Sequence, residues 1–202
     1  DFNATPYVVG NKFNDSAYNA EFGGEFNVAV DKHKLKATIN TDESTLEADP
    51  YNFSLYNRPT YLTEKRTFFS KDLDIYRSPI SLFYTRSIQN IEYGFNYTFR
   101  SDKLKAGAMF IQDDVNKTGN KRQIFVARPN YVSSDFSIGS FVLLSDDRNK
   151  DRKEKVLSLD GQYRFPENPV RILGQYASNF DGSAYELYSY YQYDNSGGPF
   201  AD

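Results

Sequence analysis

Apolar and polar residues alternate at period two along much of this chain. Ile91–Arg100 (IEYGFNYTFR) is the clearest case: its odd positions are aromatic or branched apolar, and its even positions are small, polar or charged. Successive side chains of a β-strand point to opposite faces, so this pattern predicts a strand with one apolar and one polar face. Similar segments recur at about the length that crosses a bilayer when tilted, roughly 9–11 residues.

The alternation predicts nine strands, and the connections between them alternate in length. The predicted strands are 21–30, 34–41, 91–100, 104–112, 122–132, 136–144, 157–165, 170–178 and 184–194. Short connections fall at 31–33, 101–103, 133–135 and 166–169, and longer ones at 42–90, 113–120, 145–155 and 179–183. Short periplasmic turns alternating with longer extracellular loops are typical of bacterial outer-membrane barrels.

The sequence therefore predicts an all-β fold, an antiparallel transmembrane β-barrel or partial barrel of about 9–10 strands, with a long inserted segment after the second strand. Residues 1–202 are expected to form a single barrel domain or the N-terminal portion of a larger barrel, with 42–90 as an ordered insertion at the lumen or the mouth. The first ten residues lack the charged start and apolar stretch of a signal peptide, so a mature chain or an excised fragment is expected.

Composition narrows the function classes. The chain has 17 Tyr and 17 Phe but only 39% hydrophobic residues, which suits strands with one face toward lipid and one toward a polar lumen. A net charge of −3 with dispersed basic residues argues against nucleic acid as a partner. There is no Cys, and no phosphate loop, dinucleotide fingerprint or zinc spacing, so no cofactor and no metal are expected.

The segment 42–90 carries the candidate chemistry. Its acids lie close together in the sequence and are followed by basic residues, so they could pair, bind a ligand or act as the two carboxylates of a glycoside hydrolase. We expect structural ion pairs or ligand binding, with no catalytic residue assigned. The candidate cluster is Asp42, Glu47, Asp49, Arg58, Glu64, Lys65, Arg66 and Arg86.

Motifs in the same segment resemble a known family. They are NTDESTLEAD (40–49), NRP (57–59), EKRTFF (64–69) and LFYTRSI (82–88). Their order and spacing are similar to those of uncharacterised outer-membrane barrels of Bacteroidota-like bacteria that follow a carbohydrate-binding family nine-like module, some of them labelled membrane-associated hydrolases. The resemblance implies the N-terminal portion of such a barrel in a Gram-negative outer membrane, with outer-membrane lipid, saccharides and other outer-membrane proteins as candidate partners.

Three functions remain open from the sequence. The first is an outer-membrane barrel that is non-catalytic in this segment and acts in solute passage or surface handling of saccharide-type ligands. The second is a membrane-associated, glycoside hydrolase-like enzyme that uses acids within 42–64. The third is a soluble β-sandwich binding module, which would leave the aromatic face and the alternating loop lengths unexplained.

Overall fold

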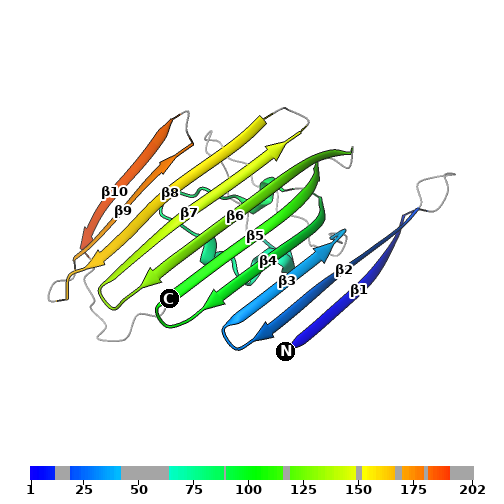
Figure 1. The fold of residues 1–202 in the computed structure, drawn as a ribbon, viewed down its shortest axis with the longest axis horizontal. Coiled ribbons are helices and arrows are strands. Elements are labelled where there is room, and N and C mark those ends of the chain that lie inside the picture. Colours follow the sequence, from blue (N-terminus) through cyan, green and yellow to red (C-terminus); the bar gives the residue numbers. More distant parts are fainter. Residues whose placement is uncertain are drawn as a thin grey trace, which may run out of the picture.

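The computed structural model describes residues 1–11, 19–41, 64–88, 90–115, 119–148, 152–166, 170–179 and 182–191. These residues form one antiparallel sheet in which each strand pairs with the next along the chain (Figure 1). The all-β, antiparallel prediction is therefore confirmed. The strands are β1 (Phe2–Asn11), β2 (Asn19–Val30), β3 (His33–Ile39), β4 (Ile91–Arg100), β5 (Leu104–Val115), β6 (Asn120–Val132), β7 (Phe136–Asp147), β8 (Arg152–Arg164), β9 (Val170–Ser178) and β10 (Ser183–Tyr191).

Strand β1 was missing from the sequence prediction. It pairs with β2 from Phe2↔Val28 to Asn11↔Asn19, which raises the count from nine strands to ten. Its Pro6 lacks the backbone donor that an interior strand needs, and this disguised the strand; an edge strand tolerates proline. The long insertion consequently follows the third strand, β3, and the predicted position after the second strand is wrong.

Two predicted loops are shorter than expected because their polar residues belong to strands. Strands β5 and β6 extend to Val115 and from Asn120, and β7 and β8 extend to Asp147 and from Arg152. The loops predicted at 113–120 and 145–155 thus shrink to 116–119 and 148–151. A polar loop and the water-exposed end of a long strand have the same composition, so loop length is a weaker barrel signal here than the sequence indicated.

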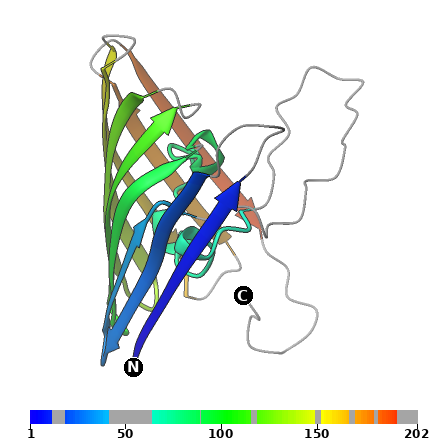
Figure 2. The same cartoon turned by 90° about the vertical axis from the view of Figure 1, so that its right-hand side faces the viewer.

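The sheet is curved and carries a short helical segment on its concave side (Figure 2). We call residues 64–88 the cover segment; it contains α1 (Thr67–Ser70) and the 3₁₀ turns η1 (Leu73–Tyr76) and η2 (Thr85–Ser87). The concave face that it contacts is called the inner face, and the opposite one the outer face. The buried hydrophobic core lies between the cover segment and the inner faces of β4–β7.

The sheet is open in the part of the chain that the structure describes. Strands β1 and β10 lie at opposite ends of the row and do not pair with each other (Figure 1). Each is an edge strand with unpaired backbone donors and acceptors, so either edge can accept a further strand.

Candidate functional site

The cover segment packs on the inner face of the sheet, called the wall below, with aromatic rings in spaces left by glycines. Phe68 and Tyr76 are both nearly inaccessible to solvent. A methyl group on Gly94 would lie 2.9 Å from the Phe68 ring, and one on Gly107 would lie 2.8 Å from Tyr76. Only a residue without a side chain allows such close approach, so these two glycines act as sockets for the cover segment.

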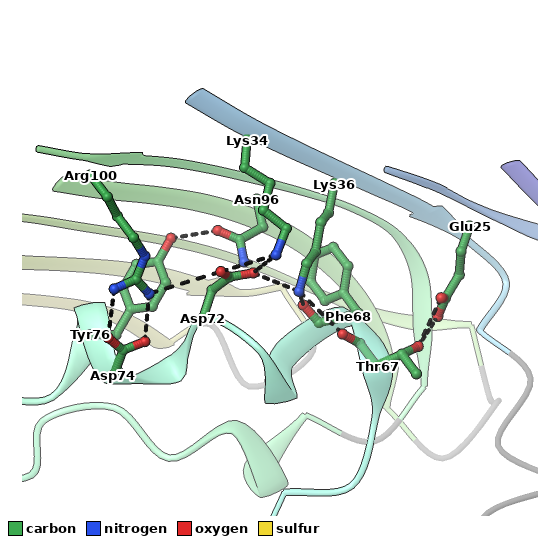
Figure 3. A network of polar contacts seen from close by, with 10 residues as sticks. All are labelled: Glu25, Lys34, Lys36, Thr67, Phe68, Asp72, Asp74, Tyr76, Asn96 and Arg100. Atoms are coloured by element: carbon green, nitrogen blue, oxygen red, sulfur yellow. Dashed lines mark hydrogen bonds and ion pairs between the residues drawn. The ribbon is translucent and has the colours of Figure 1, made fainter. Parts of the chain in front are cut away.

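Asp72 is the centre of the polar contacts between the cover segment and the wall (Figure 3). Its carboxylate lies 2.6 Å from Lys36 Nζ and 3.1 Å from Lys34 Nζ, both on β3. Lys36 also donates to the carbonyl oxygens of Thr67 and Phe68. The side chains of Asp72 and Lys36 are each only 4% exposed; the charge of Lys36 is compensated by Asp72, and that of Asp72 by Lys36 and Lys34 together.

Two more contacts continue this network along β4 (Figure 3). Arg100 donates to both carboxylate oxygens of Asp74, at 2.6 and 2.7 Å, a bidentate geometry that fixes orientation as well as distance. The Tyr76 hydroxyl donates to Asn96 Oδ1 at 2.7 Å. The inner-facing residues of β3 thus bond to Asp72, just before η1, and those of β4 bond to Asp74 and Tyr76 within it.

Arg66 joins the two ends of the cover segment. Its Nε and one terminal nitrogen donate to the two oxygens of Glu64 at 2.8 Å, and its terminal nitrogens donate to the carbonyl oxygens of Thr85 and Ile88, each also at 2.8 Å. Its guanidinium lies 4.6 Å from the centre of the Phe69 ring. This buried arginine therefore closes residues 64–88 into a loop.

The cover segment also bonds to strands toward both ends of the row, β2 and β9. The Ile80 backbone nitrogen donates to Gln175 on β9 at 2.5 Å, and the Thr67 hydroxyl donates to Glu25 on β2 at 2.6 Å. Arg122 on β6 bridges the carbonyl oxygen of Ser87 and the carboxylate of Asp113. The cover segment thus contacts the wall from β2 to β9.

The acids of the cover segment are held ionised. Burial alone would raise the pKa of Asp72, but hydrogen bonds and charge from Lys36 and Lys34 leave that pKa lowered. Burial likewise opposes ionisation of Glu64, and hydrogen bonds from Arg66 and Thr85 leave its pKa lowered. The bond from Arg100 lowers the pKa of Asp74. Burial, and then the charge of Asp72, raises the pKa of the Tyr76 hydroxyl, which stays a neutral donor.

A hollow of about 550 Å³ lies on the cover segment, between its outgoing part (70–78) and its returning part (81–85). Asp74 and Tyr76 contribute to its lining, so the hollow adjoins the network around Asp72. Arg77, Ser81 and Tyr84 line it with exposed side chains. Its volume lies in the range of small-molecule sites, about 300–1,000 Å³.

The predicted candidate cluster is described only in part. Asp42, Glu47, Asp49 and Arg58 lie outside the described residues, so the expected pairing between the acids of 42–49 and the later arginines stays a prediction. Glu64 and Arg66 form the ion pair described above. Lys65 and Arg86 are half-buried in the same segment. No group of three His, Cys, Asp or Glu that could hold a metal occurs within the described ranges.

Sequence reasoning missed the centre of the site. Lys34, Lys36 and Arg100 occupy polar positions of their predicted strands, and Asp72 and Asp74 lie in the insertion but outside the candidate cluster. Only the folded insertion shows which acids the two lysines meet.

The outer face carries an apolar band with an aromatic border on one side and a polar border on the other. Within the band, residues that pair in register across β5–β8 are small or aliphatic: Ala108, Ala127, Val142 and Leu157. Toward the turns at 31–32, 101–103, 133–135 and 165–169 it gives way to aromatic contacts, with ring-centre distances of 5.0, 5.8 and 4.9 Å for His33–Phe99, Tyr131–Phe136 and Tyr163–Phe165.

The opposite border of the apolar band is polar. It consists of residues that pair in register across the outer face of β4–β8: Tyr93, Gln112, Gln123, Asp146 and Lys153. Its members bond to one another: Gln112 accepts from Tyr93 and Gln123, each at 3.0 Å. Lys121 and Glu92 form an ion pair of 2.7 Å beside it.

Comparison with family models, curated proteins and solved structures yields no match. Among the described residues no helix is long and apolar enough to cross a bilayer.

Proposed function

We propose that this chain forms part of the wall of a bacterial outer-membrane β-barrel and that the cover segment narrows its lumen. The observation that carries the proposal is the contrast between the two faces of the same strands. Large apolar side chains such as Leu159 (64% exposed) and Ile138 (57% exposed) stand uncovered on the outer face of the described sheet. Contiguous apolar surface of this kind marks a contact with lipid or with another protein.

The borders of the apolar band favour lipid. An outward apolar belt bounded by aromatic residues at the membrane interfaces is the pattern of outer-membrane barrels. Strands β5–β8 have 12 or 13 residues each, more than the roughly 9–11 that cross a bilayer. Strands of this length extend beyond the membrane, with the row from Tyr93 to Lys153 in the headgroup region and the polar strand ends outside.

A membrane wall also requires both edges of the sheet to be paired, because unsatisfied backbone groups are costly in lipid. We therefore infer that β1 and β10 each pair with a strand in the complete barrel, so that the ten strands are an arc of its wall. This agrees with the resemblance to the N-terminal portion of the uncharacterised barrel family. In such a barrel the connections 116–119, 148–151 and 179–182 would be the extracellular loops, because short turns are periplasmic.

The inner face gives the barrel its role. The cover segment spans the wall from β2 to β9 and fixes charged and hydroxylated side chains toward the lumen, which suits selective passage or surface handling of a polar solute. Saccharide-type ligands remain the proposed class, through the resemblance to barrels that follow a carbohydrate-binding module. Outer-membrane lipid and neighbouring outer-membrane proteins are the proposed partners.

Catalysis by the described acids is the weaker alternative. A glycoside hydrolase needs one carboxylic acid that can donate a proton. Both oxygens of Glu64 accept from Arg66, its side chain is 3% exposed, and its pKa is lowered, so Glu64 is built as an anchor. A soluble sandwich would need a second sheet on the apolar face, and the described residues form one sheet.

Site-directed spin labelling in phospholipid vesicles tests this function. Labels at Leu159 and Ile138 should be accessible to oxygen dissolved in lipid, and labels at Gln162 and Asn130, which have the opposite strand parity, should be accessible to a water-soluble nickel reagent. The reverse pattern, or water access at all four positions, would refute a lipid-facing outer surface. Solubility of the unlabelled chain without detergent would refute it as well.

A further inference from the structure

The hollow on the cover segment has more positive charge available to a ligand than negative. Two of its lining residues are acids, but both oxygens of Glu64 accept from Arg66, and the half-exposed carboxylate of Asp74 is neutralised by Arg100, which donates to both of its oxygens. The exposed guanidinium of Arg77 forms no ion pair in the described part of the chain. The hydrogen bond from Arg100 is the main cause of the lowered pKa of Asp74, and the charge of Lys105 on β5, outside the lining, adds to it.

The remaining lining is suited to a hydroxylated molecule with an apolar surface. Ser70 and Ser81 are exposed residues whose hydroxyl groups form no hydrogen bond among the described residues. Tyr84 is 37% exposed, which leaves part of its ring for stacking. Polar groups on an aromatic background are the usual means by which a pocket orients a small polar ligand.

We propose that this hollow binds a small hydroxylated anion, a carboxylate or phosphate ester of sugar size, with Arg77 as the residue that recognises the negative charge. A guanidinium binds carboxylates and phosphates through paired charge-assisted hydrogen bonds. Ser70 and Ser81 contact the hydroxyl groups of the ligand, and Tyr84 packs against its carbon skeleton. The inference rests on the proposed function, since it places the ligand site within the lumen.

The floor of the hollow ties ligand binding to the wall contacts. Asp74 and Tyr76 line the hollow on one side and bond to Arg100 and Asn96 of β4 on the other. The hollow therefore keeps its shape only while η1 is attached to the wall. Rigid attachment of the lining is what holds a binding site in one geometry.

Isothermal titration calorimetry on the full chain in detergent micelles tests the proposal. The probes are galacturonate, galactose 1-phosphate and neutral galactose. We expect at least one of the two anions to bind. The dissociation constant of galactose should be at least tenfold higher than that of the bound anion. The replacement Arg77→Gln should weaken anion binding by roughly tenfold, the loss of about 1.4 kcal/mol, while leaving the weak binding of galactose unchanged.

The matched control is Arg152→Gln, which removes an exposed arginine (side chain 69% exposed) on β8 that does not line the hollow. Binding of neither anion, galactose bound as tightly as the anions, or equal losses from the two arginine variants would each overturn the proposal. Which anion binds identifies the carboxylate or the phosphate as the recognised group. The assay needs no bilayer, so it can fail while the spin-label result stands, and the reverse also holds.

Discussion

The outer and inner faces of the same strands differ in how specific their side-chain contacts are. On the outer face of β4–β9 the apolar side chains need no specific partner, and any neighbour of similar polarity satisfies them. On the inner face each buried charge has a particular partner: Lys36 has Asp72, and Arg128 of β6 has Asp160 of β8 at 2.5 Å. The outer face is therefore tolerant of changes among apolar residues, whereas the inner face depends on the identity of single residues.

The largest expected effect is on the inner face. Asp72→Ala leaves Lys36 buried without its counter-ion, a change that typically costs about 3–5 kcal/mol. Hydrogen exchange of the Phe69 and Ser70 amides, which donate to the Arg66 carbonyl oxygen, should rise sharply as the cover segment detaches. Asp74→Ala is the matched control, because Asp74 is 52% exposed and solvent screens its pair with Arg100. Equal exchange in the two variants would contradict the central role of Asp72.

A smaller but still large effect is expected on the outer face. Leu159→Arg should destabilise the chain in vesicles by about 2–4 kcal/mol if the residue lies near the middle of the bilayer. Urea unfolding followed by tyrosine fluorescence measures this, with Gln162→Arg as the inner-face counterpart. If the arginine at position 159 is tolerated as well as the one at 162, the outer face is not in lipid.

Glycine-to-alanine substitutions on the two faces compare how tightly each face is packed. Gly107→Ala places a methyl group 2.8 Å from Ile75 and Tyr76, and such overpacking typically costs about 1–3 kcal/mol. Gly161→Ala on the outer face meets nothing nearer than the Ser137 carbonyl oxygen at 3.6 Å and should be nearly neutral. The same unfolding measurement should rank the two variants in this order; the opposite order would mean that the cover segment is not seated on Gly107.

The mildest perturbation is acid. The pKa values of Asp72 and Glu64 are lowered from 3.8 and 4.5, so their stabilising contribution is complete above those values and is lost as the pH falls below them toward the folded-state values. The cover segment should loosen below about pH 4 while β5–β8 stay paired. Exchange of the Phe69 and Ile111 amides compared at pH 3 and pH 6 measures this, and loss of protection at Ile111 first would contradict it.

Sequence reasoning predicted one face well and the other in outline only. The outer face of β4 was readable because Phe95 and Tyr97 follow a strict period of two with no partner to identify. The apolar side of β1 was missed because Pro6 resembles a strand breaker. The socket glycines, Gly94 and Gly107, were seen only as small residues within strands, since the rings of Phe68 and Tyr76 that fill the space come from a segment without periodicity.

The ion pairs were beyond sequence reasoning for a physical reason. Glu64 and Arg66 are two residues apart and both belong to the predicted cluster, but the pairing expected for Arg66 was with the acids of 42–49, which lie outside the described residues. The link between Asp72 and Lys36 joins residues far apart in the chain and depends on the path of the insertion, which no local pattern encodes.

Arg66 has a consequence for how the insertion can vary. Because it ties residue 64 to residues 85 and 88, the two ends of the cover segment lie together, and residue 88 is followed closely by the start of β4 at Ile91. The exposed positions within 67–84 can therefore change without moving β4, whereas Phe68, Asp72 and Tyr76 are fixed by their contacts with the sheet.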